Sequence, residues 1–424
     1  MLGLVRPQLP SIVNGVVAVL TLPAPGHPGA AVHEFSCLEI CAGAGGQSLG
    51  LEQASFAHAA AVELDPDACA TLWLNRPGWK VVEQDVHHFD GAGYRGVELL
   101  AAGVPCPPFS IAGKQLGAED ERDLFPQALR LVRECEPAAV MLENVRGLST
   151  ARFAGYRDQV LARLRELGYQ AGWQVLNARE FGVPQLRPRF ILVAMRPAAY
   201  QHFQWPRAVR TPPTVGQRLR ELMAAGGWPG AAAWADQANG IGATLVGGSR
   251  KHGGPDLGPT RAREAWLRLR VDGKGLADAP PTAAHPLDHV PRLTLPMAAA
   301  IQGFPPDWRF SGRKTAGYRQ IGNAFPPPVA RAVGDSIRAA IAAARAVPAS
   351  GRDRLLRAGS GCDSAMTAPA AQDREDAHGH AGRDQPAPSV RLRGRRRDRL
   401  PDRGHRSGLQ VPVAAPAVPR PEQS

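Results

Sequence analysis

Residues 38–46 read Leu-Glu-Ile-Cys-Ala-Gly-Ala-Gly-Gly, an apolar run that ends in a glycine-rich turn. The run is typical of a buried strand, and glycines after a strand let the backbone approach a ligand at the start of the next helix. From Phe35 to about Arg196, further apolar runs alternate with helical patterns. This alternation predicts an α/β fold with a doubly wound parallel sheet that is covered by helices on both faces.

Five apolar runs predict strands over Ser36–Ile40, Ala57–Glu63, Val97–Ala102, Ala138–Leu142 and Phe190–Met195. Helical periodicity predicts helices over Asp65–Asn75, Leu124–Glu134 and Phe153–Leu167. After Arg196 the chain becomes rich in Gly, Pro and Arg, and only one helix is expected there, Thr260–Arg270. Regular helices are expected again over Leu295–Gln302 and Val329–Ala346.

The chain has 424 residues and a net charge of +12, which favours a polyanionic partner such as nucleic acid. Lysine is scarce beside arginine, so a GC-rich genome explains part of this charge equally well. None of the six cysteines sits in a C-x-x-C pair, which argues against a zinc site. The scattered cysteines and the lack of an apolar run that could span a bilayer predict a cytoplasmic protein without metal.

Two acidic residues follow strand-like segments beyond the glycine-rich turn. Glu63 ends the second apolar run, where an acid can bind the two ribose hydroxyls of a nucleoside. Asp85 closes a third strand-like segment and can accept a hydrogen bond from an adenine amino group. The absence of a phosphate-binding signature favours S-adenosylmethionine over a dinucleotide, although a plain strand–helix turn would show the same glycines.

The segment Gly103-Val-Pro-Cys-Pro-Pro-Phe-Ser110 places Cys106 among three prolines after an apolar run. Prolines stiffen the backbone, so the thiol is held where a substrate can meet it. A structural cysteine is more typical of the middle of a strand or helix. Because a thiolate is a strong nucleophile, Cys106 is the candidate for covalent catalysis.

Glu143 lies at the end of the apolar run in Met141-Leu-Glu-Asn-Val145, where an acid is costly unless it is paired or functional. Further along, Gln185-Leu-Arg-Pro-Arg189 carries two arginines two residues apart. If this stretch is extended, Arg187 and Arg189 leave the chain on one face. The segment from Gln320 to Val329 is expected to be a turn that opens a helix.

In this order, the glycine-rich turn, the Pro-Cys loop, Glu143, the arginine pair and the turn at 320–329 resemble the DNA cytosine-C5 methyltransferase family, of the prokaryotic restriction-modification type. The likeness covers about residues 35–345. It implies an S-adenosylmethionine-binding Rossmann-like domain over 35–196, a smaller target-recognition domain over 197–312, and a helix over 313–346 that returns to the first domain. Residues 1–34 and the Arg-rich tail 347–424 are expected to be disordered.

The resemblance implies that the protein transfers a methyl group from S-adenosylmethionine to C5 of a cytosine in a specific duplex DNA site. Cys106 would add to C6 of a flipped-out base, Glu143 would hold N3 and the amino group, and Arg187 and Arg189 would position the base and the Cys loop. The implied cofactor residues are Ala42, Gly43, Gly45, Gly46, Glu63, Asp85, Pro105 and Asn323. Ser110 is expected to contact DNA, and a cognate restriction endonuclease and a monomeric state are further expectations.

Two positions depart from the family pattern. Cys41 stands where the glycine motif usually has Phe, and Pro107 stands where Gln commonly follows the cysteine. An RNA cytosine-C5 methyltransferase remains an alternative, although the Cys-Phe-Thr signature of the tRNA branch is missing. A non-catalytic DNA-binding relative should have lost Cys106 or Glu143. A dinucleotide oxidoreductase would explain only the glycine-rich turn, and an amino-methyltransferase needs an Asn/Asp-Pro-Pro-aromatic motif that we do not find.

Residues 235–275 are expected to select the DNA sequence. The stretch Gly247-Gly-Ser-Arg-Lys-His-Gly-Gly254 combines a flexible backbone with three donors, Arg250, Lys251 and His252, that can reach guanine edges. Arg261 lies on the basic helix that follows and is a further candidate. The same charges could instead contact only phosphates, which would carry no sequence information.

Overall fold

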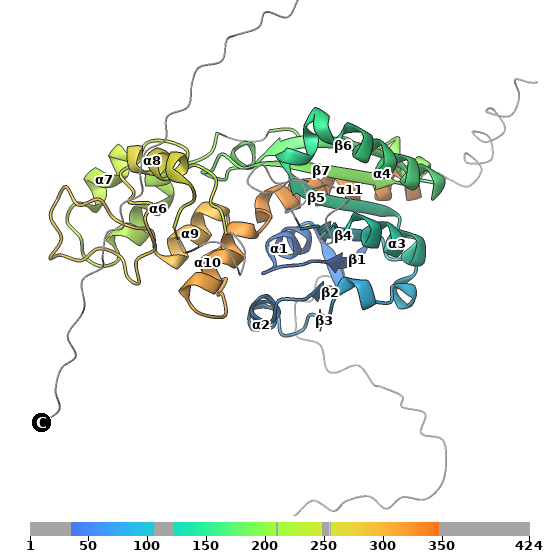
Figure 1. Cartoon of the computed structure of the whole chain (residues 1–424), viewed down its shortest axis with the longest axis horizontal. Helices are drawn as coiled ribbons and strands as arrows, with labels where there is room; N and C mark the ends of the chain where they lie inside the picture. The colour runs from blue at the N-terminus through green and yellow to red at the C-terminus, as the bar shows by residue number, and fades with distance from the viewer. Residues whose placement is uncertain (1–34, 106–122, 209–210, 248–253, 255, 347–424) are drawn as a thin grey trace, which may run out of the picture. The chain divides into compact units, whose positions relative to one another are not determined.

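The computed structural model describes residues 35–105, 123–208, 211–247, 254 and 256–346. Seven strands among these residues form one mixed sheet in the order β3-β2-β1-β4-β5-β7-β6 (Figure 1). The strands are β1 Phe35–Ile40, β2 Phe56–Glu63, β3 Val81–Glu83, β4 Leu99–Gly103, β5 Ala139–Val145, β6 Gln170–Asn177 and β7 Pro188–Met195. The five strands expected from apolar runs are confirmed, with ends that differ by up to three residues.

The sheet is not parallel throughout, so the prediction of a parallel sheet is wrong at one edge. β1 to β5 pair in parallel, whereas β7 runs antiparallel to both β5 and β6. β6 was not expected, because its sequence Gln-Ala-Gly-Trp-Gln-Val-Leu-Asn is half-buried and carries polar side chains. An edge strand needs less apolar surface than a central one and therefore lacks the continuous apolar run.

The helices fill the intervals between strands and build the second half of the chain. They are α1 Gly46–Gln53, α2 Pro66–Asn75, α3 Phe125–Cys135, α4 Ala154–Glu166, α5 Pro197–Tyr200, α6 Val215–Ala224, α7 Ala231–Gln237, α8 Thr260–Arg268, α9 Leu295–Gln302, α10 Lys314–Asn323 and α11 Pro327–Ala346. No helix among the described residues is both long enough and apolar enough to cross a membrane.

Helices cover both faces of the sheet, as the alternation of strand and helix predicts. On one face, α3 and α4 pack against alternate residues of the central strands, including Leu100 and Leu142. On the other face, α1, α5 and α11 pack against the intervening residues, including Ala101 and Met141. Helices α6 to α10 form a further core around the buried Trp266.

The region after Arg196 contains more helix than the sequence predicted. α6 and α7 were missed, and α8 ends at Arg268, two residues before the expected end. The signal for α6 was present, because Thr214 and Gln217 form a capping box and the buried Val215, Leu219 and Met223 recur every four residues. The many glycines and prolines in the loops around α6 concealed this pattern.

The chain from 313 to 346 holds two helices and not one. Residues 320–323, expected to belong to a turn, form the last turn of α10, and the break before α11 lies at Ala324–Pro326. Prolines at the start of α11 fit a helix N-terminus, where their missing N–H groups cost nothing. The predicted boundaries of the two domains stay a prediction.

α1 lies so close to α11 that Gly50 has no room for a side chain. A β-carbon there would lie 2.4 Å from the Pro327 carbonyl oxygen and 2.5 Å from the Ala330 β-carbon. We expect Gly50→Ala to lower the free energy of unfolding by about 1–3 kcal/mol, the usual cost of overpacking. Gly155→Ala on α4 is the matched control, because no heavy atom lies within 4 Å of its β-carbon position. Urea unfolding measures both, and equal stability of the two variants would contradict the packing argument.

Candidate active site

The glycine-rich turn joins β1 to α1 and contains residues of two kinds. Gly45 and Gly46 are packed by protein: a β-carbon on Gly45 would lie 2.7 Å from the Trp308 ring, and one on Gly46 would lie 2.4 Å from the Phe325 carbonyl oxygen. Gly43 is different, because its φ is +56° and nothing lies within 4 Å of its β-carbon position. Of these three glycines, Gly43 therefore faces space that a ligand could occupy.

The carboxylate of Glu63 closes this turn from the end of β2. Its oxygens accept hydrogen bonds from the backbone N–H groups of Gly43 at 2.7 Å, Asp65 at 2.8 Å and Leu64 at 2.9 Å. Burial raises the pKa of Glu63, and these backbone hydrogen bonds oppose the rise. The carboxylate thus holds the glycine-rich turn and the entry of α2 in one geometry.

Asp85 lies where β3 ends and caps the short 3-10 helix η1, Val86–His88. Its carboxylate accepts from the His87 backbone N–H at 2.9 Å, and a contact of 2.8 Å joins it to Nδ1 of His87. The backbone hydrogen bond, followed by the side-chain contact, lowers the pKa of Asp85. The charges of Glu63 and Asp85 both act on the thiol of Cys41, whose pKa is raised first by burial and then by these carboxylates. Glu63 also binds the Gly43 N–H and pairs in the sheet with Glu83, two residues before Asp85, so the turn and the two acids form one polar cluster.

This cluster fits an adenosine. Gly43 leaves room for a ligand, Glu63 and Asp85 supply acceptors for hydroxyl and amino groups, and Leu64 beside them exposes 61% of its surface. An exposed leucine next to two acceptors suits the flat face of a base. Ala42 lies buried beneath the turn and is packed against Ala61 and Leu72.

Glu143 and Arg189 form a buried ion pair at the carboxyl end of β5. The distance from Nε of Arg189 to Oε1 of Glu143 is 2.6 Å, and the two side chains expose only 10% and 7% of their surface. Burial raises the pKa of Glu143, while the positive charges of Arg189 and Arg187 oppose this rise. Both arginines of the pair therefore act electrostatically on the Glu143 carboxyl.

The end of β4 lies directly beside Glu143. Gly103 pairs with Glu143 in the register of the parallel strands. A β-carbon on Gly103 would lie 3.9 Å from Oε2 of Glu143 and 3.4 Å from the carbonyl oxygen of Cys41. The glycine-rich turn, the Glu143 carboxylate and the chain that leads through the half-buried Pro105 toward Cys106 therefore meet at one edge of the sheet.

Arg187 has a different environment from Arg189. It is fully buried, and its guanidinium donates to the carbonyl oxygens of Gly322 at 2.7 Å, Leu245 at 2.8 Å and Ala324 at 2.9 Å. A longer contact of 3.3 Å joins it to Oε1 of Gln185. Since these donors are engaged by backbone, the geometry suits a residue that holds segments together more than one that binds a base.

Gln185 and Gln302 extend this buried network. Nε2 of Gln185 donates to Oε1 of Gln302 at 2.7 Å, and Oε1 of Gln185 accepts from the Leu245 N–H at 2.9 Å. Nε2 of Gln302 in turn donates to the Ala324 carbonyl oxygen. The sequence placed Gln185 beside the arginine pair and Gln302 at the end of an expected helix, but it did not predict that their side chains meet.

Asn323 ends α10 as an exposed residue beside the same network. A β-carbon on Gly247 would lie 2.6 Å from its Oδ1. The neighbouring Ala324 lies close to the glycine-rich turn, because a β-carbon placed on Gly46 would lie 3.0 Å from the β-carbon of Ala324. The segment of Asn323 therefore lies between the cofactor side and Gly247, where the expected recognition stretch begins.

Several predicted site residues cannot be placed. Cys106, Ser110, Arg250, Lys251 and His252 lie outside the described residues. Arg261 is described and is exposed on α8, which Trp266 anchors in the core. On the same helix Arg263 pairs with Asp256 at 3.5 Å, and beyond it Arg270 donates to the Asp288 carbonyl oxygen. 

Comparisons with known proteins agree with this geometry. The C-5 cytosine-specific DNA methylase family model matches residues 35–339. Type II methyltransferase M.NaeI of Lentzea aerocolonigenes is 57% identical over 329 residues, which cover 77% of this chain and 79% of the relative. Type II methyltransferase M.NgoMIV of Neisseria gonorrhoeae is 50% identical over 308 residues, which cover 72% of this chain and 97% of the relative.

The fold also has a counterpart among solved structures. A protein assigned as a DNA modification methyltransferase in an Escherichia coli prophage superimposes with a TM-score of 0.50 at 22% identity. The superposition covers 73% of this chain and 99% of that one. This likeness supports the Rossmann-like methyltransferase fold.

The buried contacts of Arg187 predict a large effect on stability. Arg187→Met should lower the free energy of unfolding by several kcal/mol, because each buried acceptor left without a donor costs about 1–3 kcal/mol. Arg187→Lys should recover only part of this loss, since a lysine lacks the planar fork that reaches several carbonyls. Arg268→Met, at an exposed arginine on α8, is the control and should change stability by less than about 0.5 kcal/mol. Urea unfolding curves with the same midpoint for Arg187→Met and Arg268→Met would refute this structural role.

Proposed function

Because this chain belongs to the C-5 cytosine-specific DNA methylase family, we propose that the residues at the carboxyl edge of its sheet carry the methyl transfer. The protein is a DNA cytosine-C5 methyltransferase of the restriction-modification type and uses S-adenosyl-L-methionine. The observation that supports the site is the pairing of Gly103 with Glu143. Cys106 follows Gly103 by three residues, which span at most about 11 Å, so it can reach a base held by Glu143.

Cys106 is the proposed nucleophile. Its thiolate adds to C6 of the cytosine, and the electrons of the C5–C6 double bond move toward C5 and N3. Glu143 holds N3 and the amino group and donates a proton to N3, so that negative charge does not accumulate on the ring. The raised pKa of its carboxyl favours the protonated form that this step needs.

S-adenosyl-L-methionine supplies an electrophilic methyl group, which C5 of the activated ring accepts. A base then removes the proton from C5, the C5–C6 double bond forms again, and the Cys106 thiolate leaves. N3 returns its proton to Glu143, which restores the neutral base and the starting state of the carboxyl. Because C6 is inaccessible in a duplex, the target base must leave the helix, which costs a few kcal/mol. Ser110 is proposed to contact the DNA from which the base is flipped.

The arginines have separate proposed tasks. Arg189 orients the Glu143 carboxylate through the ion pair of 2.6 Å. Arg187 acts as a positioning residue, since its guanidinium donates to three backbone carbonyl oxygens in two other segments, at Leu245 and at Gly322 and Ala324. Both tasks serve the geometry of Glu143, which must meet N3 and the amino group at the same time.

The cofactor is proposed to bind along the glycine-rich turn. Glu63 would hold the ribose hydroxyls, Asp85 the adenine amino group, and the backbone of Gly43 would approach the ligand most closely. The remaining proposed members of this pocket are Ala42, Gly45, Gly46, Pro105 and Asn323. Gly45 and Gly46 contribute by letting protein pack against the turn and not by direct contact.

Residues 235–275 are proposed to select the DNA site. Arg250, Lys251 and His252 begin three residues after Gly247 in the sequence, and Arg187 holds the carbonyl oxygen of Leu245, two residues before Gly247. The exposed Arg261 is the fourth candidate. We further propose that the protein acts as a monomer in the cytoplasm, where its DNA lies, and that a cognate restriction endonuclease recognises the same duplex site.

Trapping on modified DNA tests the nucleophile. DNA that contains 5-fluorocytosine should form a covalent adduct with the wild-type protein, because fluorine blocks the final loss of a proton from C5. Cys106→Ser should form no adduct and transfer no methyl group, yet bind S-adenosyl-L-methionine as the wild type does. Mass spectrometry locates the modified residue, and an adduct on Cys41 or another cysteine would overturn the assignment.

Site selection by the recognition segment can be read from a randomised DNA library. If Arg250 or Arg261 contacts a base edge, its replacement by Ala should relax one position of the methylated site at a cost of about 1–3 kcal/mol. If it contacts only phosphate, all sites should weaken evenly and the salt dependence should fall. Bisulfite sequencing at two salt concentrations distinguishes these results, with Arg163→Ala on α4 as a control at an exposed arginine elsewhere. Unchanged site preferences in both variants would rule out base reading by these two arginines.

A further inference from the structure

The turn that carries Asp85 has little regular structure of its own. It follows β3, a strand of three residues at the edge of the sheet, and continues through η1 to Gly91. Within the turn, Gln84 donates to the carbonyl oxygen of His88 at 3.0 Å, and Asp85 caps η1. Short edge segments of this kind depend on contacts with the rest of the protein to keep one conformation.

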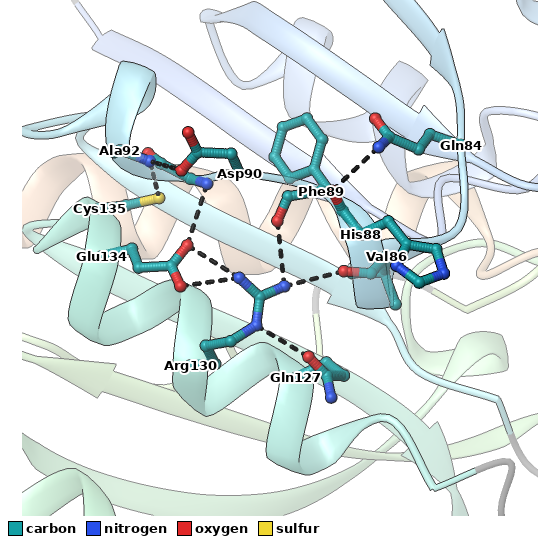
Figure 2. A network of polar contacts seen from close by, with 11 residues as sticks. Gln84, Val86, His88, Phe89, Asp90, Ala92, Gln127, Arg130, Glu134 and Cys135 are labelled. Carbon is teal, nitrogen blue, oxygen red and sulfur yellow. Dashed lines mark hydrogen bonds and ion pairs between the residues drawn. The ribbon is translucent and has the colours of Figure 1, made fainter.

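Arg130 on α3 provides such contacts from the neighbouring helix (Figure 2). Its Nη2 donates to the carbonyl oxygens of Val86, the first residue of η1, at 2.8 Å and of Phe89, the residue after η1, at 3.1 Å. Its Nε donates to Oε1 of Gln127 at 2.8 Å. One guanidinium therefore binds both ends of the short helix that Asp85 caps.

Glu134, one turn further along α3, orients this guanidinium and binds the turn itself. Nη1 of Arg130 donates to both carboxylate oxygens of Glu134, at 2.7 and 2.9 Å. Oε2 of Glu134 also accepts from the Gly91 backbone N–H at 3.0 Å, and the Cys135 thiol donates to the Gly91 carbonyl oxygen at 3.3 Å (Figure 2). A side chain at Gly91 would collide here, because its β-carbon would lie 2.8 Å from the sulfur.

The Arg130–Glu134 pair is more buried than an ordinary surface ion pair and makes additional hydrogen bonds to backbone. Arg163 and Glu166 on α4 form an ordinary pair three residues apart, with 67% and 59% of their side chains exposed. The side chains of Arg130 and Glu134 expose only 26% and 24%, and both also bind the backbone of a distant segment. A helix pair alone stabilises a protein by about 0.3–0.5 kcal/mol, so the additional backbone contacts require another explanation.

We propose that Arg130 and Glu134 are positioning residues for cofactor binding. They hold the turn 84–91 so that the Asp85 carboxylate meets the adenine amino group. The inference rests on the proposed role of Asp85, and it adds α3 to the elements that set the affinity for S-adenosyl-L-methionine. The turn is also joined to Glu63, the proposed ribose ligand, because the Gln84 backbone N–H donates to the Glu63 carbonyl oxygen at 3.0 Å.

Calorimetric titration of the full chain with S-adenosyl-L-methionine tests this role. Arg130→Met should raise the Kd about tenfold, which corresponds to about 1.4 kcal/mol. Arg130→Lys should give a similar loss, since lysine cannot bridge two carbonyls and a carboxylate together. In turnover assays the loss should lie in KM for S-adenosyl-L-methionine and not in kcat. Arg163→Met is the matched control, because it removes a helix ion pair without backbone contacts and should leave Kd unchanged.

Asp85→Ala and the double variant Arg130→Met/Asp85→Ala separate this inference from the proposed function. If Arg130 acts through Asp85, the double variant should bind as weakly as Asp85→Ala alone. An unchanged Kd for Asp85→Ala would overturn the role of Asp85, whereas a weakened Asp85→Ala with an unchanged Arg130→Met would overturn the positioning role. A fall in melting temperature with an unchanged Kd would show that the contacts are merely structural. Glu134→Gln, which keeps an acceptor for Gly91, provides the same comparison if Arg130→Met fails to fold.

Discussion

A fully buried guanidinium joins the parts of this enzyme that must act together. Arg187 donates to the carbonyl oxygens of Leu245, Gly322 and Ala324. Leu245 lies in the proposed recognition segment 235–275, and Gly322 and Ala324 lie in the chain beside the glycine-rich turn. A buried cation is costly unless its donors are used, so these segments have to converge on it when the chain folds. Arg189, two residues along, pairs with Glu143. The proposed recognition segment, the proposed cofactor side and the Glu143 carboxylate are therefore all held by the short stretch of backbone from Arg187 to Arg189.

The direction of β7 makes this arrangement possible. The carboxyl ends of β1, β2, β4 and β5 bring the glycine-rich turn, Glu63, Gly103 and Glu143 to one edge of the sheet. Because β7 runs antiparallel to β5, its start lies at that same edge, and Arg189 pairs there with Val145. In a parallel arrangement the start of β7 would lie at the opposite edge, and the arginine pair would be a strand length away from the carboxylate.

The cofactor side depends on contacts from three directions. Trp308 packs on Gly45 and donates to the Ala44 carbonyl oxygen at 3.2 Å. A residue late in the chain therefore holds the glycine-rich turn, which lies early in the chain. Glu63 holds the same turn through the Gly43 N–H. On the far side, α3 holds the turn of Asp85 through Arg130. The proposed cofactor surface thus consists of short loops that helices and strands support, and such support limits the entropy that a protein loses on binding.

The sequence alone determined the elements whose signals are local. The apolar run before Ala42, the glycines after it, the prolines around Cys106 and the acid at Glu143 each show their character within a few residues, and together they predicted the fold class and the chemistry. Tertiary structure decided the direction of β7, which glycines face open space and which face protein, and the partners of Arg187. Those partners lie 58, 135 and 137 residues away, and no local pattern encodes which distant carbonyl a buried donor will meet. Only the packing of the whole chain, which leaves a buried guanidinium no water to bind, selects them.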